Sequence, residues 1–433
     1  MGFPPDHALR RELHDEVHAR PTVGFAAPVR LTTIALLTNW SERAVQHQHL
    51  CELLARFNQP APGAEATHLA CDLGPFRLKW ERHTEFTRYI FVVAGADHDP
   101  FSRTALDLVP RDWLAAVPGE VIFAAHAAVL PMRERPEDNA QISTRYFGGD
   151  PLIGSEIADG RAAAFTDFRI DAAGFSRFLI FDRSMSHMQT ARNVQRLFEI
   201  EIYRLVALLS MPVARKLDPE LGRMEQELVA VTSELSGADG ANAQGLLDRL
   251  IALSVAIERS QAASHFRFSA SEAYHELVVR RIADLREERI DGLQTFEEFL
   301  ERRLAPAMAT CRSMASRLEG LSVRVARATQ LLSTQVELVR EHQNQTILGS
   351  LNQRARLQLL LQEAVEGLSI AAMTYYGVGL LSYALKGLKA LHVDVNTDMA
   401  TAAGIPIIAL LLFRGVRRVR KSIAIAGADG GAG

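Results

Sequence analysis

Apolar residues are spaced differently in three parts of the chain. Up to about residue 183, short apolar runs alternate with turn residues, which is typical of strands. From about residue 184 onward, apolar residues recur every three or four positions, which indicates helices. Two long, nearly uncharged runs follow near the C-terminus. The pattern predicts an α+β protein with an N-terminal α/β domain, a helical middle region containing a long stalk helix, and a C-terminal two-helix transmembrane hairpin.

In the first part, turn residues mark the boundaries of each expected element. Ser41 is placed to cap a helix, because its hydroxyl accepts an early backbone N–H. The segment 139–160 is rich in glycine and polar residues, and we expect mainly loop there. The expected strands are 29–38, 67–73, 76–82, 88–94, 120–130, 162–170 and 175–182, and the expected helices are 9–19, 42–57 and 112–116.

The middle region predicts a succession of helices that ends in one long helix. Pro306 suits the first turn of this last helix, where its missing N–H costs nothing. A coiled-coil-like seam follows, and the polar residues 341–345 leave open whether the helix continues unbroken. The expected helices are 186–211, 219–237, 241–264, 270–303 and 306–385, and the seam residues are Leu318, Leu321, Val325, Ala328, Leu332 and Val339.

The two uncharged runs, 368–385 and 399–413, predict membrane spans. The first has about 18 residues and reaches roughly 27 Å as a helix, close to the thickness of a bilayer's hydrocarbon core. A soluble protein with two core helices is the alternative, but basic residues directly after the second run favour a membrane. These expected interface anchors are Arg414, Arg417, Arg418, Arg420 and Lys421.

Charge predicts how the hairpin is oriented. The segment 386–398 carries two Lys and two Asp, whereas the segment after the second run is only basic. The positive-inside rule therefore places both chain termini in the cytoplasm, with the lipid bilayer as a partner. The expected domains are 1–183 (α/β), 184–305 (helical), 306–366 (stalk), 367–421 (transmembrane hairpin) and 422–433 (disordered tail).

Composition narrows the function further. The net charge of −3 gives no sign of a nucleic-acid partner, and we expect none. The three cysteines are scattered without a CxxC spacing, which fits a reducing compartment. The first 21 residues have no apolar run, so we expect no cleavable secretory signal. No nucleophile with a nearby base is recognisable, so we expect no enzymatic activity.

One face of the long helix is small and polar at its apolar end. Such groups gain nothing from contact with lipid, so they belong against another helix or water. Two interpretations remain: the face lines a pore in a homo-oligomer, or it packs against another helix in the ordinary way. The members of this stripe are Gln358, Gln362, Glu366, Ser369, Ala372, Tyr376, Gly379 and Tyr383.

Metal binding has one candidate pair. His14 and His18 lie four positions apart, on one face of the expected helix, a spacing that can hold a metal such as a divalent cation. Glu16 is one position later than a zinc-protease motif requires, and a polar packing helix is the alternative. Two other polar clusters are more ambiguous. The acidic residues Glu287, Glu288, Asp291, Glu297 and Glu298 on an expected helix could sense divalent ions between protomers, but the neighbouring arginines favour solvated ion pairs. Thr166–Arg169 lies on an expected strand and could form an exposed functional patch.

Three stretches of the chain are distinctive: LHDEVHARP at Leu13, RYFGGDPLIGSEIADGRAAAFTDFRI at Arg145 and NQRARLQLLLQEAVEGLSIAAMTYY at Asn352. Together they resemble an uncharacterised bacterial membrane-anchored family, known as a domain of unknown function. The resemblance implies a protein of the bacterial inner membrane. It implies no known activity and supplies no catalytic residues.

The order of the parts is also similar to that of CorA-type magnesium channels. Those are pentamers in which a stalk helix continues into a pore-lining span, with a Gly-Met-Asn signature at its outer end. Here the corresponding place reads YALKGL from Tyr383, so the signature is absent, and Lys386 would repel a dication. We therefore hold two hypotheses: an oligomeric cation channel or transporter of CorA-like build, or a membrane-anchored scaffold or sensor with a ligand- or partner-binding α/β domain.

Overall fold

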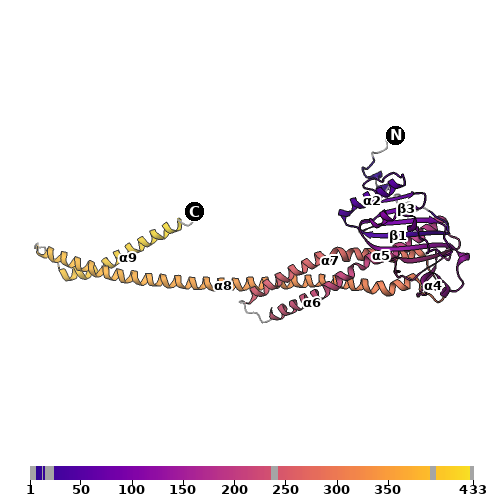
Figure 1. Ribbon diagram of the computed structural model, residues 1–433. Helices are drawn as coiled ribbons and strands as arrows, with labels where there is room; N and C mark the ends of the chain where they lie inside the picture. Colours follow the sequence, from indigo (N-terminus) through magenta and orange to yellow (C-terminus); the bar gives the residue numbers. More distant parts are fainter. Residues whose placement is uncertain (1–5, 12, 15–23, 236–241, 391–395, 430–433) are drawn as a thin grey trace, which may run out of the picture. The chain divides into compact units, whose positions relative to one another are not determined.

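The computed structural model describes residues 6–11, 13–14, 24–235, 242–390 and 396–429. The chain forms two compact units, which are described separately. The first comprises Met1–Ala238 and Gly245–Gln330, and the second comprises Asp239–Gln244 and Leu331–Gly433. The first unit holds a mixed sheet and a helical bundle (Figure 1). The expected α+β fold class is confirmed.

Within the described ranges, nine strands form one sheet in the order β2-β3-β4-β1-β5-β8-β7-β6-β9. Its neighbouring strands are antiparallel except β5 and β8, which run parallel. The ninth strand follows α7 in the chain, so the sheet extends beyond the expected 1–183 range. The strands are β1 Val29–Leu37, β2 His68–Asp72, β3 Arg77–Arg82, β4 Phe86–Ala94, β5 Glu120–Pro131, β6 Ile153–Ile157, β7 Ala162–Thr166, β8 Ser176–Asp182 and β9 Glu288–Arg289.

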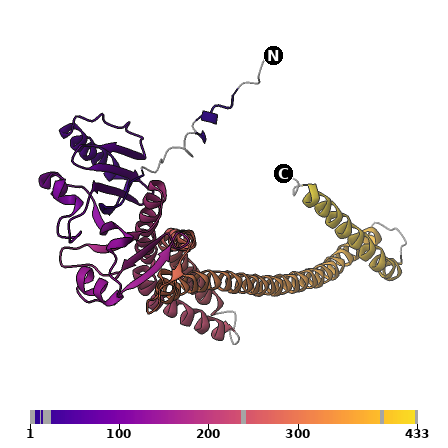
Figure 2. The same cartoon turned by 90° about the vertical axis from the view of Figure 1, so that its right-hand side faces the viewer.

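Helices cover both faces of the sheet, which explains why its central strands are apolar on both sides. On one face, α2 (Arg43–Arg56) and α3 (Arg111–Ala115) share a core with β1, β3 and β4. On the same face, α4 (Asn139–Phe147) shares a second core with β7 and β8. The opposite face packs against α5 (His187–Leu208), as Figure 2 shows.

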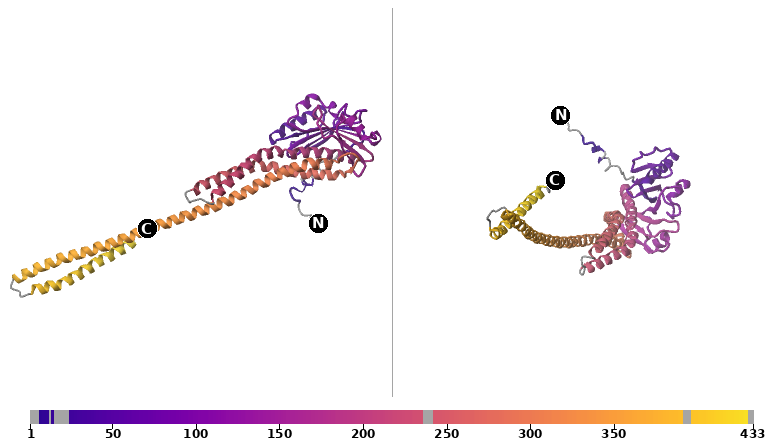
Figure 3. Two further views of the ribbon diagram at one scale, coloured as in Figure 1. Left: turned by 90° about the horizontal axis from the view of Figure 1, so that it is seen from below. Right: turned by 90° about the vertical axis from the view of Figure 1, so that its left-hand side faces the viewer.

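The bundle of the first unit consists of α6 (Ser210–Leu235), α7 (Ala243–Leu285) and the beginning of α8 (Phe296–Ala390), which lie side by side (Figures 1 and 3). Ion pairs join these helices. Arg317 of α8 lies 2.8 Å from Glu225 of α6, and Arg312 of α8 lies 2.9 Å from Glu272 of α7. The predicted seam supplies buried residues: Leu318, Leu321, Val325, Ala328 and Leu332 are all buried.

Several predicted helix ends are wrong. α6 contains Pro219, and α8 begins at Phe296 and contains Pro306, whereas proline was expected to end or begin a helix there. A proline removes one backbone hydrogen bond, and the buried neighbours Leu304 and Met308 offset this loss by packing. α7 is one continuous helix where two were expected.

The loops were also misjudged in three places. The segment 139–160 contains α4 and β6 instead of mainly loop. The strand expected over 162–170 ends at Thr166, because Phe168 adopts a left-handed φ of 53° and the Asp167 carboxylate accepts the backbone N–H of Arg169. Ser41 does not cap α2. It lies in the short 3-10 helix Trp40–Glu42, which Asn39 caps.

The second unit contains the rest of α8 and α9 (Thr397–Asp429). α8 is unbroken through residues 341–345, which answers the question that the polar patch left open. α9 reaches Asp429, so most of the expected disordered tail is helical. Both helices contain a segment long and apolar enough to cross a membrane. They meet through two glycines: a Cβ at Gly377 would lie 3.0 Å from Ile408, and one at Gly404 would collide with Leu381.

Candidate functional site

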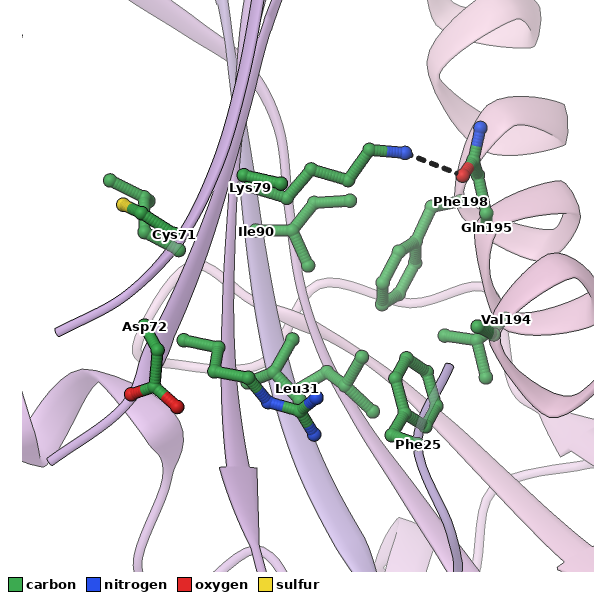
Figure 4. A pocket seen from close by; sticks show the side chains of 14 residues that line it. Phe25, Leu31, Cys71, Asp72, Lys79, Ile90, Val194, Gln195 and Phe198 are labelled. Atoms are coloured by element: carbon green, nitrogen blue, oxygen red, sulfur yellow. Dashed lines mark hydrogen bonds between the residues drawn. The ribbon is translucent and has the colours of Figure 1, made fainter. Parts of the chain in front are cut away.

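A cavity of about 190 Å³ lies between α5 and the half of the sheet formed by β3, β4 and β1. Its walls are mainly apolar (Figure 4). Alternate residues of a strand point to the same face, so Leu31 and Ile90 face α5. On α5, Val194 and Phe198 are one helical turn apart and face the sheet. The segment before β1 adds the buried ring of Phe25.

Two cations lie at the polar edge of this cavity. Arg77 and Lys79 occupy alternate positions of β3 and so lie on the same face as the apolar walls. Lys79 Nζ donates to Gln195 Oε1 at 2.8 Å, as Figure 4 shows, and lies 3.0 Å from Glu81 Oε1. Burial lowers the pKa of Lys79, against the opposing effect of Glu81. Arg77 Nη1 donates to the carbonyl oxygen of Gly24 at 3.2 Å.

Gln195 connects the cavity to a buried group of charges. While its Oε1 accepts from Lys79, its Nε2 donates to Glu199 Oε1 at 2.6 Å. Glu199 is buried and also accepts from Arg281 Nε of α7 at 2.5 Å. The cavity is therefore linked by consecutive hydrogen bonds to a helix of the bundle.

Arg88 lies at the centre of this group. Its Nε donates to Glu81 Oε2 at 2.9 Å, and its Nη2 lies 3.4 Å from Glu199 Oε1. Burial alone would raise the pKa of both carboxyls, but the adjacent guanidinium of Arg88 holds each below its usual value. Both carboxylates are thus charged at neutral pH inside the protein. We call Lys79, Glu81, Arg88, Gln195, Glu199 and Arg281 the buried ion network.

A second polar group lies on the opposite face of the sheet. The Thr32 hydroxyl lies 2.8 Å from Nδ1 of His126, and the His126 ring stacks on Phe175 at 4.2 Å between centroids. Burial lowers the pKa of His126 to about 4. The imidazole is therefore neutral at physiological pH, and its hydrogen bond to the buried Thr32 gives it a structural role.

The predicted metal pair is not brought together in the described ranges. His14 is exposed within a short helical stretch, and His18 lies outside those ranges. Over the part of the chain that the structure covers, no group of three or more His, Cys, Asp or Glu side chains is placed to hold a metal ion. The acidic residues from Glu287 to Glu298 do not form one helical surface. Glu287 instead accepts the backbone N–H groups of Phe296 and Glu297, at the start of α8.

The two tyrosines of the predicted polar stripe, Tyr376 and Tyr383, lie on a face of α8 away from α9. At 3.6 residues per turn, Tyr376 is more than a quarter turn from the residues that meet α9, Gly377 and Leu381. Tyr376 and Tyr383 are 71% and 75% exposed in the single chain. The other stripe members are exposed (Gln358, Gln362, Ala372) or half-buried (Glu366, Ser369, Gly379).

The expected interface anchors follow the second apolar segment on α9. Arg414, Arg417 and Arg418 are exposed there. Arg420 and Lys421 belong to the same helix, but their side chains lie outside the described part.

The sequence did not reveal the cavity, although it held one signal for it. In β3, the charged residues Arg77, Lys79 and Glu81 alternate with the apolar residues Leu78 and Trp80 before Arg82 ends the strand. A strand with apolar residues on one face and three charges on the other is expected at a solvated face. Here the charged face is covered by α5, and covered charges mark either a paired network or a binding site.

Comparison with known proteins gives a family and no activity. A family model described as "Protein of unknown function (DUF3422)" matches residues 5–423. No curated protein and no solved structure matches the chain. The match includes the sheet, the bundle and both apolar helices. This protein therefore belongs to that family of unknown function, as the resemblance in its sequence implied.

Proposed function

We propose that this protein is a membrane-anchored sensor. In this proposal the two apolar helices lie in the bacterial inner membrane, and the sheet-bearing unit binds a small ligand in the cytoplasm. The observation that carries the proposal is the position of Gln195. Its side chain bonds to Lys79 at the cavity and to Glu199 in the buried ion network.

This arrangement supports sensing because the network has little freedom to absorb a local change. Arg88 and Glu81 are only 1% and 3% exposed, so water cannot replace a lost partner. A ligand that shifts Lys79 alters the partners of Gln195, and then those of Glu199 and Arg281. Arg281 belongs to α7, so α7 is the helix expected to respond.

The membrane assignment is supported by the two apolar segments and by the cations that follow the second. Arg414, Arg417 and Arg418 sit next to its end, where long basic side chains reach the phospholipid headgroups. The positive-inside rule then favours a cytoplasmic C-terminus. Because two crossings return the chain to the same side, the sheet-bearing unit is also assigned to the cytoplasm.

Hydrogen–deuterium exchange of the full chain in lipid nanodiscs tests the sensor. With saturating 1-hexanol or hexanoate as probes, we expect slower exchange in β3 and α5, and a change in α7 near Arg281. Val194→Phe fills the cavity and should remove the response. Val45→Phe is the matched control, because Val45 is 55% exposed on α2 and remote from the cavity.

A further variant isolates the connection to α7. Gln195→Leu keeps the apolar wall and removes both hydrogen bonds, so the probes should still protect β3 while α7 no longer responds. If neither probe changes exchange at β3 or α5 in the unaltered protein, the sensor proposal is lost.

A second candidate function, an oligomeric cation channel, is favoured by the polar stripe on α8. Because Tyr376 and Tyr383 of the stripe face away from α9, they are available to neighbouring copies of the chain in a homo-oligomer. Liposomes containing the protein should then pass Mg²⁺, Zn²⁺, Ni²⁺ or monovalent cations, and Tyr376→Leu should change the rate. Liposomes that stay tight to all these ions would exclude the channel.

A further inference from the structure

We infer that the cavity beneath α5 binds a carboxylate with a short apolar body, on the order of six to eight carbon atoms. This inference rests on the proposed function, since it names the ligand of the same cavity. It depends on three features: the size of the cavity, its two cations and the charge balance around them.

The size of the cavity limits the ligand's body. Its volume of about 190 Å³ is somewhat larger than a buried cavity of about 150 Å³ that holds benzene in another protein. The walls next to this space are the side chains of Leu31, Ile90, Val194 and Phe198. An apolar group of about benzene's size or slightly larger gains most from such a surface.

The two cations at the edge provide the recognition of the head group. Lys79 has three N–H donors, and the described contacts occupy two of them, to Gln195 and Glu81. Arg77 has five, of which one goes to the Gly24 carbonyl oxygen. The two side chains start about 7 Å apart on one face of β3. A carboxylate between them can accept from the remaining Lys79 donor and from Arg77, and it draws Lys79 away from Gln195.

The ion pairs around the cavity favour a ligand with a single negative charge. The cations Lys79, Arg88 and Arg281 pair with the carboxylates Glu81 and Glu199, and Arg281 shares the carboxylate of Asp284 with Arg196. The guanidinium of Arg77 has no ion-pair partner among the described residues. The acidic residue of the cavity is Asp72 of β2, which lies opposite Arg77 in the strand register and is exposed.

A half-buried guanidinium at an apolar cavity suits a carboxylate, whose two oxygens match its planar donors. A neutral ligand would leave the Arg77 guanidinium without an ion-pair partner. A phosphate monoester would bring about two negative charges close to the carboxylate of Asp72, and would have to be desolvated against apolar walls.

Calorimetric titration of the full chain in nanodiscs tests this inference, with empty nanodiscs subtracted for partition into lipid. The probes are hexanoate, 1-hexanol and hexylamine, which share one body and differ in head-group charge. We expect hexanoate to bind at least tenfold more tightly than 1-hexanol, and hexylamine to bind more weakly than either. Dodecanoate should bind more weakly than hexanoate, because its chain exceeds the cavity; tighter binding would indicate a membrane-derived acyl chain and overturn the size assignment.

Arg77→Gln should weaken hexanoate binding tenfold or more and leave 1-hexanol binding unchanged, which also reports that the cavity is intact. Arg82→Gln is the matched control, since Arg82 lies on the opposite face of β3. If 1-hexanol binds as tightly as hexanoate, or if Arg77→Gln weakens both equally, the carboxylate assignment is wrong while the sensor proposal stands. If no probe binds, both fail.

Discussion

The guanidinium of Arg88 donates to the carboxylate of Glu81 on the neighbouring strand, and neither side chain reaches solvent. Their side chains are 1% and 3% exposed, and the Nε to Oε2 distance is 2.9 Å. A second carboxylate, that of Glu199 on α5, lies 3.4 Å from the same guanidinium. Arg88 therefore joins the sheet to the helix that covers it, and it keeps two buried negative charges apart.

Removing this cation should be among the most damaging single changes in the sheet-bearing unit. Arg88→Met leaves Glu81 and Glu199 buried without their main partner, and we expect a loss of about 3–5 kcal/mol in the free energy of unfolding. Denaturation of the full chain in detergent can be followed by tryptophan fluorescence, because its three tryptophans, Trp40, Trp80 and Trp113, all lie in this unit.

The control for this experiment is Arg111→Met, because Arg111 is exposed on α3. It should change the free energy of unfolding by less than about 0.5 kcal/mol. If Arg88→Met were as mild as this control, the buried ion network would not hold α5 to the sheet, and the connection proposed through Gln195 would lose its basis.

The carboxylate of Glu287 secures the beginning of α8. It accepts the backbone N–H groups of Phe296 at 2.8 Å and Glu297 at 3.1 Å, and the Ser155 hydroxyl of β6 at 2.5 Å. Glu287→Ala leaves these donors unpaired, and we expect a loss of about 2–4 kcal/mol. Glu288→Ala changes the exposed neighbour and should be nearly neutral. Exchange of the Phe296 and Glu297 amides should rise only in the first variant.

Most of the sheet was predictable, because its strands are short apolar runs bounded by glycine and proline. The element boundaries that were predicted wrongly depend on contacts between residues far apart in the sequence. Phe168 leaves the predicted strand and stacks on Phe299, at 4.5 Å between centroids, and its left-handed backbone has no local signal. Pro306 lies inside α8 because packing on both sides offsets one lost hydrogen bond.

The candidate site was harder to predict than the fold. Its polar edge joins Lys79 to Gln195, which are 116 positions apart in the sequence. Only the charged face of β3 indicated it, and nothing in the sequence tells which helix covers that face. By contrast, the two apolar segments near the C-terminus depend on local composition alone, and the structure confirms both as helices long enough to cross a membrane.

The buried imidazole of His126 should make stability depend on pH. Its pKa in the folded protein is about 4, below its ordinary value of 6.5, because burial disfavours the charged form. Between these values the unfolded chain binds the proton more readily. Stability contributed by His126 is therefore complete above pH 6.5 and falls toward pH 4, by on the order of 3 kcal/mol.

Replacing the titratable group isolates this effect. His126→Gln retains a partner for Thr32 and removes the titration, so its unfolding free energy should change less between pH 6.5 and 4 than that of the unaltered protein. His265→Gln, on the exposed face of α7, should retain the full dependence. Equal slopes for the two variants would show that other groups cause the acid sensitivity. Urea denaturation at a series of pH values provides the comparison.

The glycine at position 404 should determine how closely α9 approaches α8. A Cβ at Gly404 would collide with the Leu381 side chain, whereas one at Gly379 of the polar stripe would meet nothing within 4 Å. Gly404→Val should therefore separate the two helices, and Gly379→Val is its matched control. Pulsed electron paramagnetic resonance between spin labels at Tyr375 and Leu411, both exposed, measures the separation in nanodiscs. We expect a longer and broader distance distribution for Gly404→Val alone. Close approach through a small residue is what holds such helices together in lipid. An equal change in both variants would therefore mean that the contact between position 404 and Leu381 does not set the distance between α8 and α9.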